Sequence, residues 1–298
     1  AADPDFERGL LKWLKEDAER QLRAAAATAE GRESVLRPAV ATVIGRTYAE
    51  AGSPVLASPS AQWRDTHFHF KGVVTEPGRG EEVAIDWYQP VNPDGRAVVW
   101  LEDDGVAGLR KGNAPRPEVQ KLIEAGVAVI GVNLHLQGGE PVKETRLVAG
   151  PREVPAYTFG YNSSLFAQRV HDVLTVVRML KTDRSPDHPE VKTVDLMGIG
   201  RAGVVPSAAR AVLGDSVRRT AVDTAGFRFS QLLSYRDPMV LPGGSKYLDV
   251  PGLLALCPPD RLWIAGESSL PEFVSADAVR FDGPAESRAS AAVEWLLK

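Results

Sequence analysis

The sequence predicts an α/β protein with a mainly parallel sheet and helices on both faces. From Ala97 to the C-terminus, short apolar segments of strand length alternate with longer amphipathic segments of helix length. The segment Val127 to Leu134 consists mostly of Val, Ile and Ala, as a strand buried on both faces requires. Residues 191–214 then read as a strand, a glycine-rich turn with the sequence GIGRAG, and a helix. Together these patterns predict repeated βα units in one layered domain.

The bulk composition bounds the class of protein and its partners. A chain of 298 residues suits one large α/β domain or two small ones. Its net charge of −4 disfavours nucleic acid and anionic membranes as main partners. The longest apolar runs, such as residues 127–132, are far too short to span a bilayer. The single cysteine, Cys257, excludes an internal disulfide. We therefore expect a globular protein that acts on neither nucleic acid nor membranes.

The N-terminal part of the chain is predicted to be helical. Phe6 to Glu30 carries an apolar stripe at helical spacing, and Glu33 to Ile44 reads as a second helix. Gly45 to Pro59 is rich in turn-forming residues. We expect residues 1–51 to form a helical segment and linker, and residues 52–298 to form the α/β domain. The first helix either packs on that domain or pairs with a partner.

An antiparallel hairpin is predicted at the start of the domain. Gln62 to Val74 and Glu82 to Gln89 alternate apolar and polar residues around the turn sequence PGRG. His67 and His69 are two apart, so they face one side of a strand. Because no third metal ligand is suggested nearby, we expect a surface or packing role for both.

The rest of the chain is predicted to alternate between strands and helices. The expected strands are Ala97 to Leu101, Val127 to Leu134, Val191 to Met197, Arg219 to Val222, Arg261 to Ala265, and Ala278 to Phe281. The expected helices are Arg116 to Glu124, Leu165 to Leu180, Val204 to Gly214, and Ala285 to Leu297. Ser163 and Ser164 precede one of these helices, where serine is an expected cap.

The turn GIGRAG stands where a nucleophile elbow, G-x-S-x-G, would stand between strand and helix. From about Trp63 to Lys298 the chain resembles the α/β-hydrolase superfamily. Within it, the segments TFGYNSSLFAQRVHDVL and LPGGSKYLDVPGLLAL are most similar to bacterial carbohydrate esterases of the acetyl xylan and glucuronoyl esterase kind, and to dienelactone hydrolases. The chain also resembles the triad-less second domain of tandem esterase-like chains. The resemblance implies an α/β-hydrolase fold.

The catalytic triad that this resemblance implies is incomplete. Its residues follow the chain order Ser, acid, His, and the nucleophile position is Gly200. The acid is Asp223, or alternatively Glu267. The histidine should follow the last strand near Asp282, but all five histidines precede the elbow. The resemblance therefore implies a degenerate triad.

The loop that would form the oxyanion hole also departs from the family pattern. It reads Leu101-Glu102-Asp103-Asp104-Gly105 instead of HGGG. Carboxylates at this position would repel a developing oxyanion rather than stabilise it.

Polar residues follow most of the predicted strands, at the edge where α/β sheets bind ligands. They are Glu102, Asp103, Asp104, His135, Gln137, Arg201, Asp223, Glu267 and Asp282. Such carboxylates bind sugar hydroxyls, cationic groups, or Ca²⁺ and Mg²⁺; alternatively they are solvated turn residues or helix caps. We expect His135 to reach this crevice. Arg201, at the start of the predicted helix, either holds an anion beside free backbone N–H groups or pairs with Asp223 or Glu267. Aromatic residues such as Tyr157, Tyr161 and Tyr235 are candidates for its walls.

Three functional hypotheses follow. The first is a non-catalytic binding or structural module that acts beside an active carbohydrate esterase domain, with a carbohydrate or small ester as ligand and no cofactor. The second is an active hydrolase with an unorthodox site, built from the rim carboxylates, His135 or a metal-activated water. The third is a serine esterase whose nucleophile has been replaced by Gly200. The resemblance to secreted polysaccharide esterases implies a periplasmic or secreted location.

Overall fold

The computed structural model describes residues 4–139, 142–145, 154–185, 188 and 190–298. Its strands are β1 (Val55–Arg64), β2 (His67–Glu76), β3 (Glu81–Pro90), β4 (Arg96–Leu101), β5 (Arg110–Lys111), β6 (Ala114–Pro115), β7 (Ala128–Val132), β8 (Thr193–Gly198), β9 (Thr220–Asp223), β10 (Leu262–Ala265) and β11 (Val279–Phe281). Its α-helices are α1 (Pro4–Ala27), α2 (Ala29–Gly31), α3 (Arg37–Ile44), α4 (Pro117–Glu124), α5 (Pro155–Phe159), α6 (Leu165–Thr182), α7 (Val205–Leu213), α8 (Asp249–Ala255) and α9 (Arg288–Leu297).

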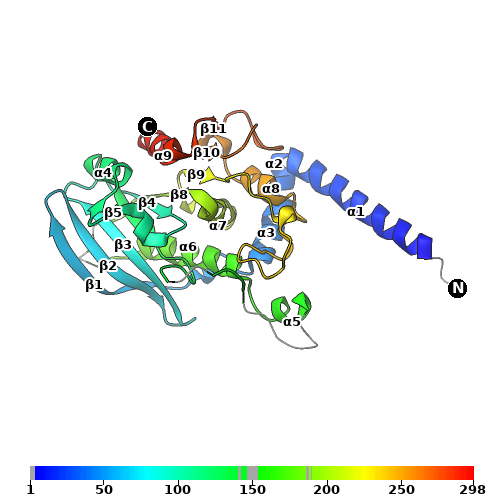
Figure 1. Ribbon diagram of the computed structural model, residues 1–298, viewed down its shortest axis with the longest axis horizontal. Helices are drawn as coiled ribbons and strands as arrows, with labels where there is room; N and C mark the ends of the chain where they lie inside the picture. Colours follow the sequence, from blue (N-terminus) through cyan, green and yellow to red (C-terminus); the bar gives the residue numbers. More distant parts are fainter. Residues whose placement is uncertain (1–3, 140–141, 146–153, 186–187, 189) are drawn as a thin grey trace.

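One large twisted sheet organises the described part of the chain (Figure 1). Its strand order is β1-β2-β3-β7-β4-β8-β9-β10-β11. The first three strands are antiparallel to one another, and β3 is also antiparallel to β7. From β7 to β11 every neighbouring pair is parallel. The predicted mainly parallel sheet is confirmed, and β8 lies inside it between β4 and β9.

Helices cover both faces of this sheet, as predicted. On one face α3, α6, α7 and α8 contribute to a large apolar core that also includes strand residues such as Val99 and Leu196. On the other face α4 and α9 pack over Trp100, Met197 and Trp263. Short βα connections force the helices onto the two faces, and each helix buries its apolar side there. The elbow at the end of β8 therefore rests on a packed scaffold.

The first strand was not predicted from the sequence. Residues 45–59 read as a turn-rich linker, but β1 begins at Val55 and pairs with β2 along its length. The register of this pair shifts between Ala57 and Ser60, where the sequence is Ser-Pro. Proline is tolerated in an edge strand or at a bulge because its missing N–H breaks no essential ladder bond. Pairing with β2 therefore outweighs the local turn propensity.

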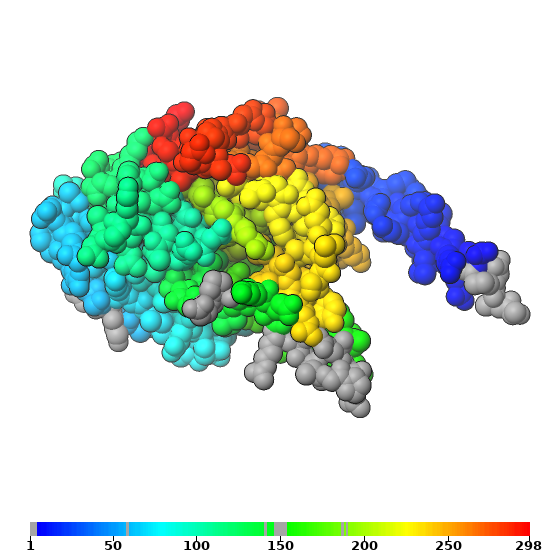
Figure 2. Space-filling model, viewed as in Figure 1, coloured from blue at the N-terminus to red at the C-terminus, as the bar shows by residue number. Residues whose placement is uncertain are grey.

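The N-terminal helices differ from each other in how they meet the body. The predicted helix from Phe6 to Glu30 is interrupted at Thr28, whose hydroxyl accepts a hydrogen bond from the Gly31 N–H and starts α2. A π-helical turn, η1 (Arg32–Leu36), leads into α3. Helix α3 buries Val40 and Ile44 in the core, whereas α1 projects away from the body (Figures 1 and 2). Helix α1 is the longest described helix, yet no helix in the described ranges is long and apolar enough to cross a membrane.

Candidate functional site

The glycine-rich turn forms a sharp elbow between β8 and α7. Gly200 begins a 3₁₀ turn, η4 (Gly200–Val204), with a backbone φ of +71°. A residue other than glycine would be strained in this left-handed region. This geometry is typical of an elbow that presents a nucleophile, and here the residue at its tip has no side chain.

The carboxylate of Asp103 occupies the space above this elbow. Its two oxygens accept hydrogen bonds from the backbone N–H groups of Arg201, at 3.1 Å, and Ala202, at 2.7 Å. A Cβ atom added to Gly200 would lie 2.5 Å from the nearer Asp103 oxygen. An anion is stabilised here because free N–H groups at the start of a helical turn point toward it. Asp103 thus lies where a nucleophile side chain and its reaction centre would otherwise lie.

The Asp103 carboxylate in the oxyanion loop binds backbone donors of the elbow. From the sequence we expected its carboxylates to repel a developing oxyanion. In the structure Asp103 engages the N–H of the residue after the elbow tip, which is the group that donates to the oxyanion in enzymes of this geometry. The donor is therefore occupied by an anion that the chain itself supplies.

Asp223, the first candidate for the acid, lies beneath the elbow. It is 2% exposed and is the last residue of β9. Its carboxylate accepts hydrogen bonds from the Arg288 guanidinium at 3.0 Å, the Ala225 N–H at 2.9 Å and, more weakly, the Gly200 N–H at 3.4 Å. Both oxygens therefore hold local structure in place.

Glu267, the alternative acid, is likewise engaged. The Arg228 guanidinium binds both of its oxygens, at 2.9 and 2.6 Å, and the Thr224 hydroxyl donates to one of them at 2.5 Å. The expected pairing of Arg201 with Asp223 or Glu267 is wrong. Arg201 lies nearest to the Asp237 carboxylate, at 3.9 Å, because Arg288 and Arg228 already neutralise the two buried acids.

Glu102 and Gln137 connect the loop after β4 with the loop after β7. The Gln137 amide donates to the backbone oxygens of Glu102 and Asp103, both at 3.3 Å. The Glu102 carboxylate turns toward Arg116, at 2.8 Å, and the Trp100 indole, at 3.1 Å. Burial raises the pKa of Glu102 to about 7, although Arg116 opposes that shift. These contacts position the loop that carries Asp103.

His135 lies at the end of the loop after β7 and is held through its backbone. Its N–H donates to the buried carboxylate of Asp172 at 2.5 Å, and its carbonyl accepts from Arg169 at 3.2 Å. Partial burial, with a contribution from Arg169, lowers the pKa of the His135 imidazole. Burial raises the pKa of Asp172 to about 7. Neither Asp172 nor Arg169 was singled out from the sequence, where both read as parts of one amphipathic helix.

The remaining rim acids do not gather into a metal site. Asp104 is exposed, and Asp282 is an exposed partner of Arg280. Across the described ranges, no group of three or more His, Cys, Asp or Glu residues is placed to hold a metal ion. Most of the predicted rim acids instead bind arginines or backbone N–H groups, which are partners that the sequence pattern did not reveal.

The structural histidines behave as the sequence suggested. His67 and His69 are buried beside Tyr88, and His69 stacks on that ring with 4.5 Å between centroids and bonds to Asp86 at 3.0 Å. His171 bonds to the backbone oxygen of Ile44 at 2.7 Å. Of the surface or packing role predicted for His67 and His69, the structure shows packing.

A cleft of about 760 Å³ opens beside the elbow. It is lined by Asp103, Asp104, Ala107, Leu134, Leu136, Gln137, Gly138, Gly139, Val142, Lys143, Arg169, Arg201, Ala202, Val205, Asp237, Pro238 and Met239. The lining includes His135's two neighbours rather than His135 itself, and none of the aromatic residues expected as walls. Tyr157 and Tyr161 are exposed; Tyr157 belongs to α5, which projects from the body in Figure 1, and Tyr161 follows that helix. The cleft therefore combines charged side chains of both signs with apolar side chains, and none of its lining residues is aromatic.

The contact of Asp103 with the elbow predicts a local contribution to stability. Asp103→Ala should lower the free energy of unfolding by about 1 to 2 kcal/mol, because it removes the acceptor from two N–H groups at the start of a helical turn. The neighbouring Asp104→Ala variant is the matched control, and its effect should stay within about 0.5 kcal/mol, as for an ordinary surface position. Urea denaturation of both variants measures the difference. Equal effects would show that Asp103 is a surface residue like its neighbour.

Comparison with known proteins places the fold. No family model and no curated protein sequence matches the chain. Acetyl xylan esterase 1 from Thermoanaerobacterium sp. JW/SL YS485 is similar in structure, with 12% identity over 89% of this chain and 93% of that chain and a TM-score of 0.55. A promiscuous CE15 esterase from a marine bacterial metagenome has 14% identity, 91% and 81% coverage and a TM-score of 0.53. A putative acetyl xylan esterase from Bacteroides fragilis NCTC 9343 has 14% identity, 79% and 67% coverage and a TM-score of 0.51. The chain therefore has the α/β-hydrolase fold that these esterases share.

Proposed function

We propose that this chain is a non-catalytic module with an α/β-hydrolase fold, and that it binds a ligand at the cleft beside its elbow. The observation that carries the proposal is the Asp103 carboxylate, which binds the N–H groups of Arg201 and Ala202 above Gly200. A serine hydrolase needs a nucleophile at the elbow tip and free donors beside it. This chain has no nucleophile at the elbow tip, and the Asp103 carboxylate already occupies the N–H donors beside it.

The base is the second missing part. Among the described histidines, His171 is tied to Ile44 and His188 to Asp183, and His67 and His69 lie on β2 among the first, antiparallel strands of the sheet. The fifth, His135, is held through its backbone by Asp172 and Arg169 and does not line the cleft beside the elbow. Loss of the nucleophile or the base each costs on the order of a million-fold in serine hydrolases. Ester hydrolysis by the usual route is therefore expected to be negligible.

The cleft supports binding of a polar ligand. Arg169, Arg201 and Lys143 face it together with Asp103, Asp104 and Asp237. Guanidinium groups donate hydrogen bonds to ligand hydroxyls and carboxylates, and carboxylate groups accept hydrogen bonds from ligand hydroxyls. The proteins of similar fold include esterases of xylan, so a carbohydrate or a small carbohydrate ester is the ligand class we propose. An adjacent or separate esterase domain acting on the same polymer is the proposed partner.

Hydrolysis of nitrophenyl acetate tests the absence of catalysis. The chain, its Gly200→Ser variant and the Gly200→Ser/Asp103→Ala double variant should all stay at the rate of a protein-free blank, because no histidine lines the cleft beside the elbow to act as the base. Recovery of turnover in Gly200→Ser alone would show that the chain is a serine esterase whose nucleophile was replaced. Turnover by the unaltered chain that chelator abolishes would overturn the proposal in favour of a metal-dependent hydrolase.

Titration calorimetry with xylo-oligosaccharides and glucuronic acid tests the binding half of the proposal. Arg169→Ala and Arg201→Ala should each weaken binding by about tenfold or more, since a charge-assisted hydrogen bond contributes about 1.5 to 3 kcal/mol. The matched control is Arg64→Ala, at an exposed arginine at the end of β1 that donates a hydrogen bond to the nearby Gln62 side chain. Equal binding by all three variants would place the ligand elsewhere on the molecule.

One observation favours a second candidate, a hydrolase with an unorthodox base. Glu102 lies next to the elbow loop, and burial raises its pKa to about 7, which suits a general acid or base. However, its carboxylate points to Arg116 and Trp100 and does not line the cleft. If the unaltered chain turns over an ester and Glu102→Gln abolishes this, the second candidate replaces the first.

A further inference from the structure

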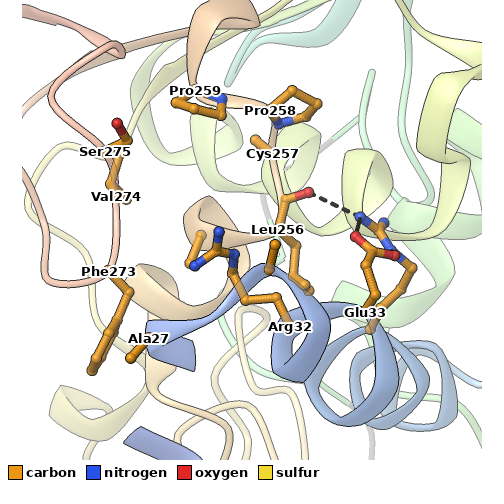
Figure 3. Close-up of a pocket in the computed structure, with 13 residues that line it drawn as sticks. Ala27, Arg32, Glu33, Leu256, Cys257, Pro258, Pro259, Phe273, Val274 and Ser275 are labelled. Atoms are coloured by element: carbon orange, nitrogen blue, oxygen red, sulfur yellow. Dashed lines mark hydrogen bonds and ion pairs between the residues drawn. The ribbon is translucent and has the colours of Figure 1, made fainter. Parts of the chain in front are cut away.

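A groove lies where the N-terminal helices meet the body of the chain. It has a volume of about 490 Å³, and Figure 3 shows the side chains around it. Residues 27–37 line it from the N-terminal side, and residues 255–259 and 273–275 line it from the body. Most of its lining is apolar, with four polar members: Ala27, Ala29, Ala255, Leu256, Cys257, Pro258, Pro259, Phe273 and Val274, and then Arg32, Glu33, Arg37 and Ser275. An apolar concavity of this size with a few polar groups is typical of a site for a small ligand.

Arg32 brings a positive charge into this groove that the protein itself does not neutralise. Its Nη1 donates to the backbone oxygen of Ala26 at 2.7 Å, and within the described ranges the guanidinium makes this one hydrogen bond and no ion pair. The contact caps a carbonyl near the end of α1 and uses one N–H. Figure 3 shows the guanidinium between Leu256 and the segment that carries Phe273. Its other N–H groups form a planar fork that suits the two oxygens of a carboxylate.

Arg37, the second guanidinium of the lining, is fully engaged by contrast. The Glu33 carboxylate accepts from its Nε at 2.6 Å and from its Nη2 at 2.7 Å, and two backbone oxygens accept from Nη1 and Nη2. The hydrogen bond from Arg37 is the first cause of the lowered pKa of Glu33. Burial raises the pKa of the Cys257 thiol to about 11, so that side chain carries no negative charge near neutral pH. The charge of Arg32 is therefore the one left uncompensated among the described lining residues.

Two unusual backbone conformations border the same groove. Arg32 begins η1, the π-helical turn, and Phe273 has a backbone φ of +70°. Single π-helical turns occur frequently at functional sites, and a bulky residue held in the left-handed region is strained in a way that proteins retain mainly where a ligand is gripped. The Phe273 ring lies beside Ala27 at one end of the groove (Figure 3), with the Arg23 guanidinium 5.9 Å from its centroid. The strained backbone thus holds an aromatic ring at the groove.

We propose that this groove binds a small aromatic carboxylate, with Arg32 as its counter-ion and Phe273 as the wall against which its ring packs. The uncompensated charge selects an acid over a neutral ligand. The Phe273 ring selects an aromatic body over an aliphatic one, because aromatic pairs gain more than their buried area alone provides. Among the described residues, this groove and the cleft beside the elbow have no lining residue in common. The proposal therefore does not depend on the ligand proposed for that cleft.

Titration calorimetry with three small molecules tests the chemistry of the site. The unaltered chain should bind 3-phenylpropanoate about tenfold or more tightly than 3-phenylpropan-1-ol, which keeps the ring but has a hydroxyl in place of the carboxylate. Hexanoate keeps the carboxylate but has no ring, and it should bind about two- to tenfold more weakly than the aromatic acid. An alcohol or a hexanoate that binds as tightly as 3-phenylpropanoate, or no binding of the aromatic acid, would overturn the proposal.

Variants of the chain test the place of binding. Arg32→Gln keeps a donor for the Ala26 oxygen but loses the charge, so it should bind 3-phenylpropanoate about tenfold or more weakly. Arg64→Gln makes the same change at the exposed end of β1 and should bind like the unaltered chain. Phe273→Leu leaves Arg32 in place and removes the ring, so it should bind 3-phenylpropanoate no more tightly than hexanoate. Full binding by a folded Arg32→Gln variant, or an unchanged preference for the aromatic acid in Phe273→Leu, would overturn the proposal.

Discussion

Replacing Gly203 with alanine is expected to destabilise the chain by about 3 kcal/mol or more, because overpacking at a backbone contact cannot relax by rotating a side chain. A Cβ atom at this position would overlap the backbone carbonyl oxygen of Asp223. Gly203 lies in η4, where the chain leaves the elbow and presses against the end of β9. The close approach exists because glycine has no side chain there.

Gly9→Ala is the matched control for this prediction. Gly9 lies inside α1, and nothing stands within 4 Å of its would-be Cβ. The same change there should stabilise the chain slightly, by about 0.5 to 1 kcal/mol, because alanine is the better helix former. Urea or thermal unfolding of both variants gives the two signs. A Gly203→Ala variant as stable as the unaltered chain would show that the elbow is loosely packed.

This contrast explains how an elbow persists where no nucleophile stands on it. Gly198 is enclosed in the same way, since a Cβ atom there would lie 2.6 Å from Pro206 and 2.9 Å from Gly203. Two of the three glycines in the turn are thus required by packing between β8, β9 and α7. Only the tip residue, Gly200, belongs to the chemistry of a serine hydrolase. The turn motif is therefore evidence for the fold, whereas the tip residue is evidence about function.

The sequence predicted the fold in the regions where periodicity is strong. The buried strands β4, β7 and β8 and the long helix α6 were predicted to within a few residues, since their apolar residues face the core on regular spacing. Strand β1 was missed because its pairing with β2 is tertiary and its own residues favour turns. The short helices α5 and α8 were missed because neither is long enough to show a period.

The candidate site was predicted only in part for a related reason. Gly200, Asp223 and Glu267 follow strands, so their place at the carboxyl edge could be inferred from the chain order. The contact of Asp103 with Arg201 joins residues 98 positions apart, and nothing local indicates it. The arginines that pair with Asp223 and Glu267 could not be predicted from the sequence either, since any of several arginines could neutralise a buried acid. Sequence reasoning located the elbow, but it could not show that a carboxylate already binds its N–H groups.

Asp172 is the second position where a large effect is expected, and it depends on pH. Its carboxylate is 8% exposed in α6 and receives the His135 N–H at the margin of the cleft. Burial, reinforced by the negative charge of Glu81 and opposed by that hydrogen bond, raises its pKa from 3.8 to about 7. The folded chain therefore holds a proton on Asp172 at a pH where the unfolded chain has lost it. Stability from this group is fully present below about pH 4 and is lost as the pH rises through about 7.

Asp172→Asn should remove this dependence, because the amide stays neutral and its oxygen can still accept the His135 N–H. Between about pH 5 and pH 8 the variant should gain about 2 to 3 kcal/mol relative to the unaltered chain, since the folded pKa lies roughly two units above the lower pH and each unit corresponds to about 1.4 kcal/mol. Urea denaturation of both proteins at the two pH values measures the difference. His67, His135 and His171, whose pKa values are lowered, act in the opposite direction but are common to both proteins and cancel.

Asp65→Asn provides the control, since it makes the same chemical change at an exposed turn between β1 and β2. Its stability should run parallel to that of the unaltered chain across the pH range. If the Asp172→Asn curve also runs parallel, Asp172 is ionised in the folded chain and its negative charge must be compensated by Arg169 or Arg46. If it diverges as expected, the loop that carries His135 is held by a neutral carboxyl near pH 5.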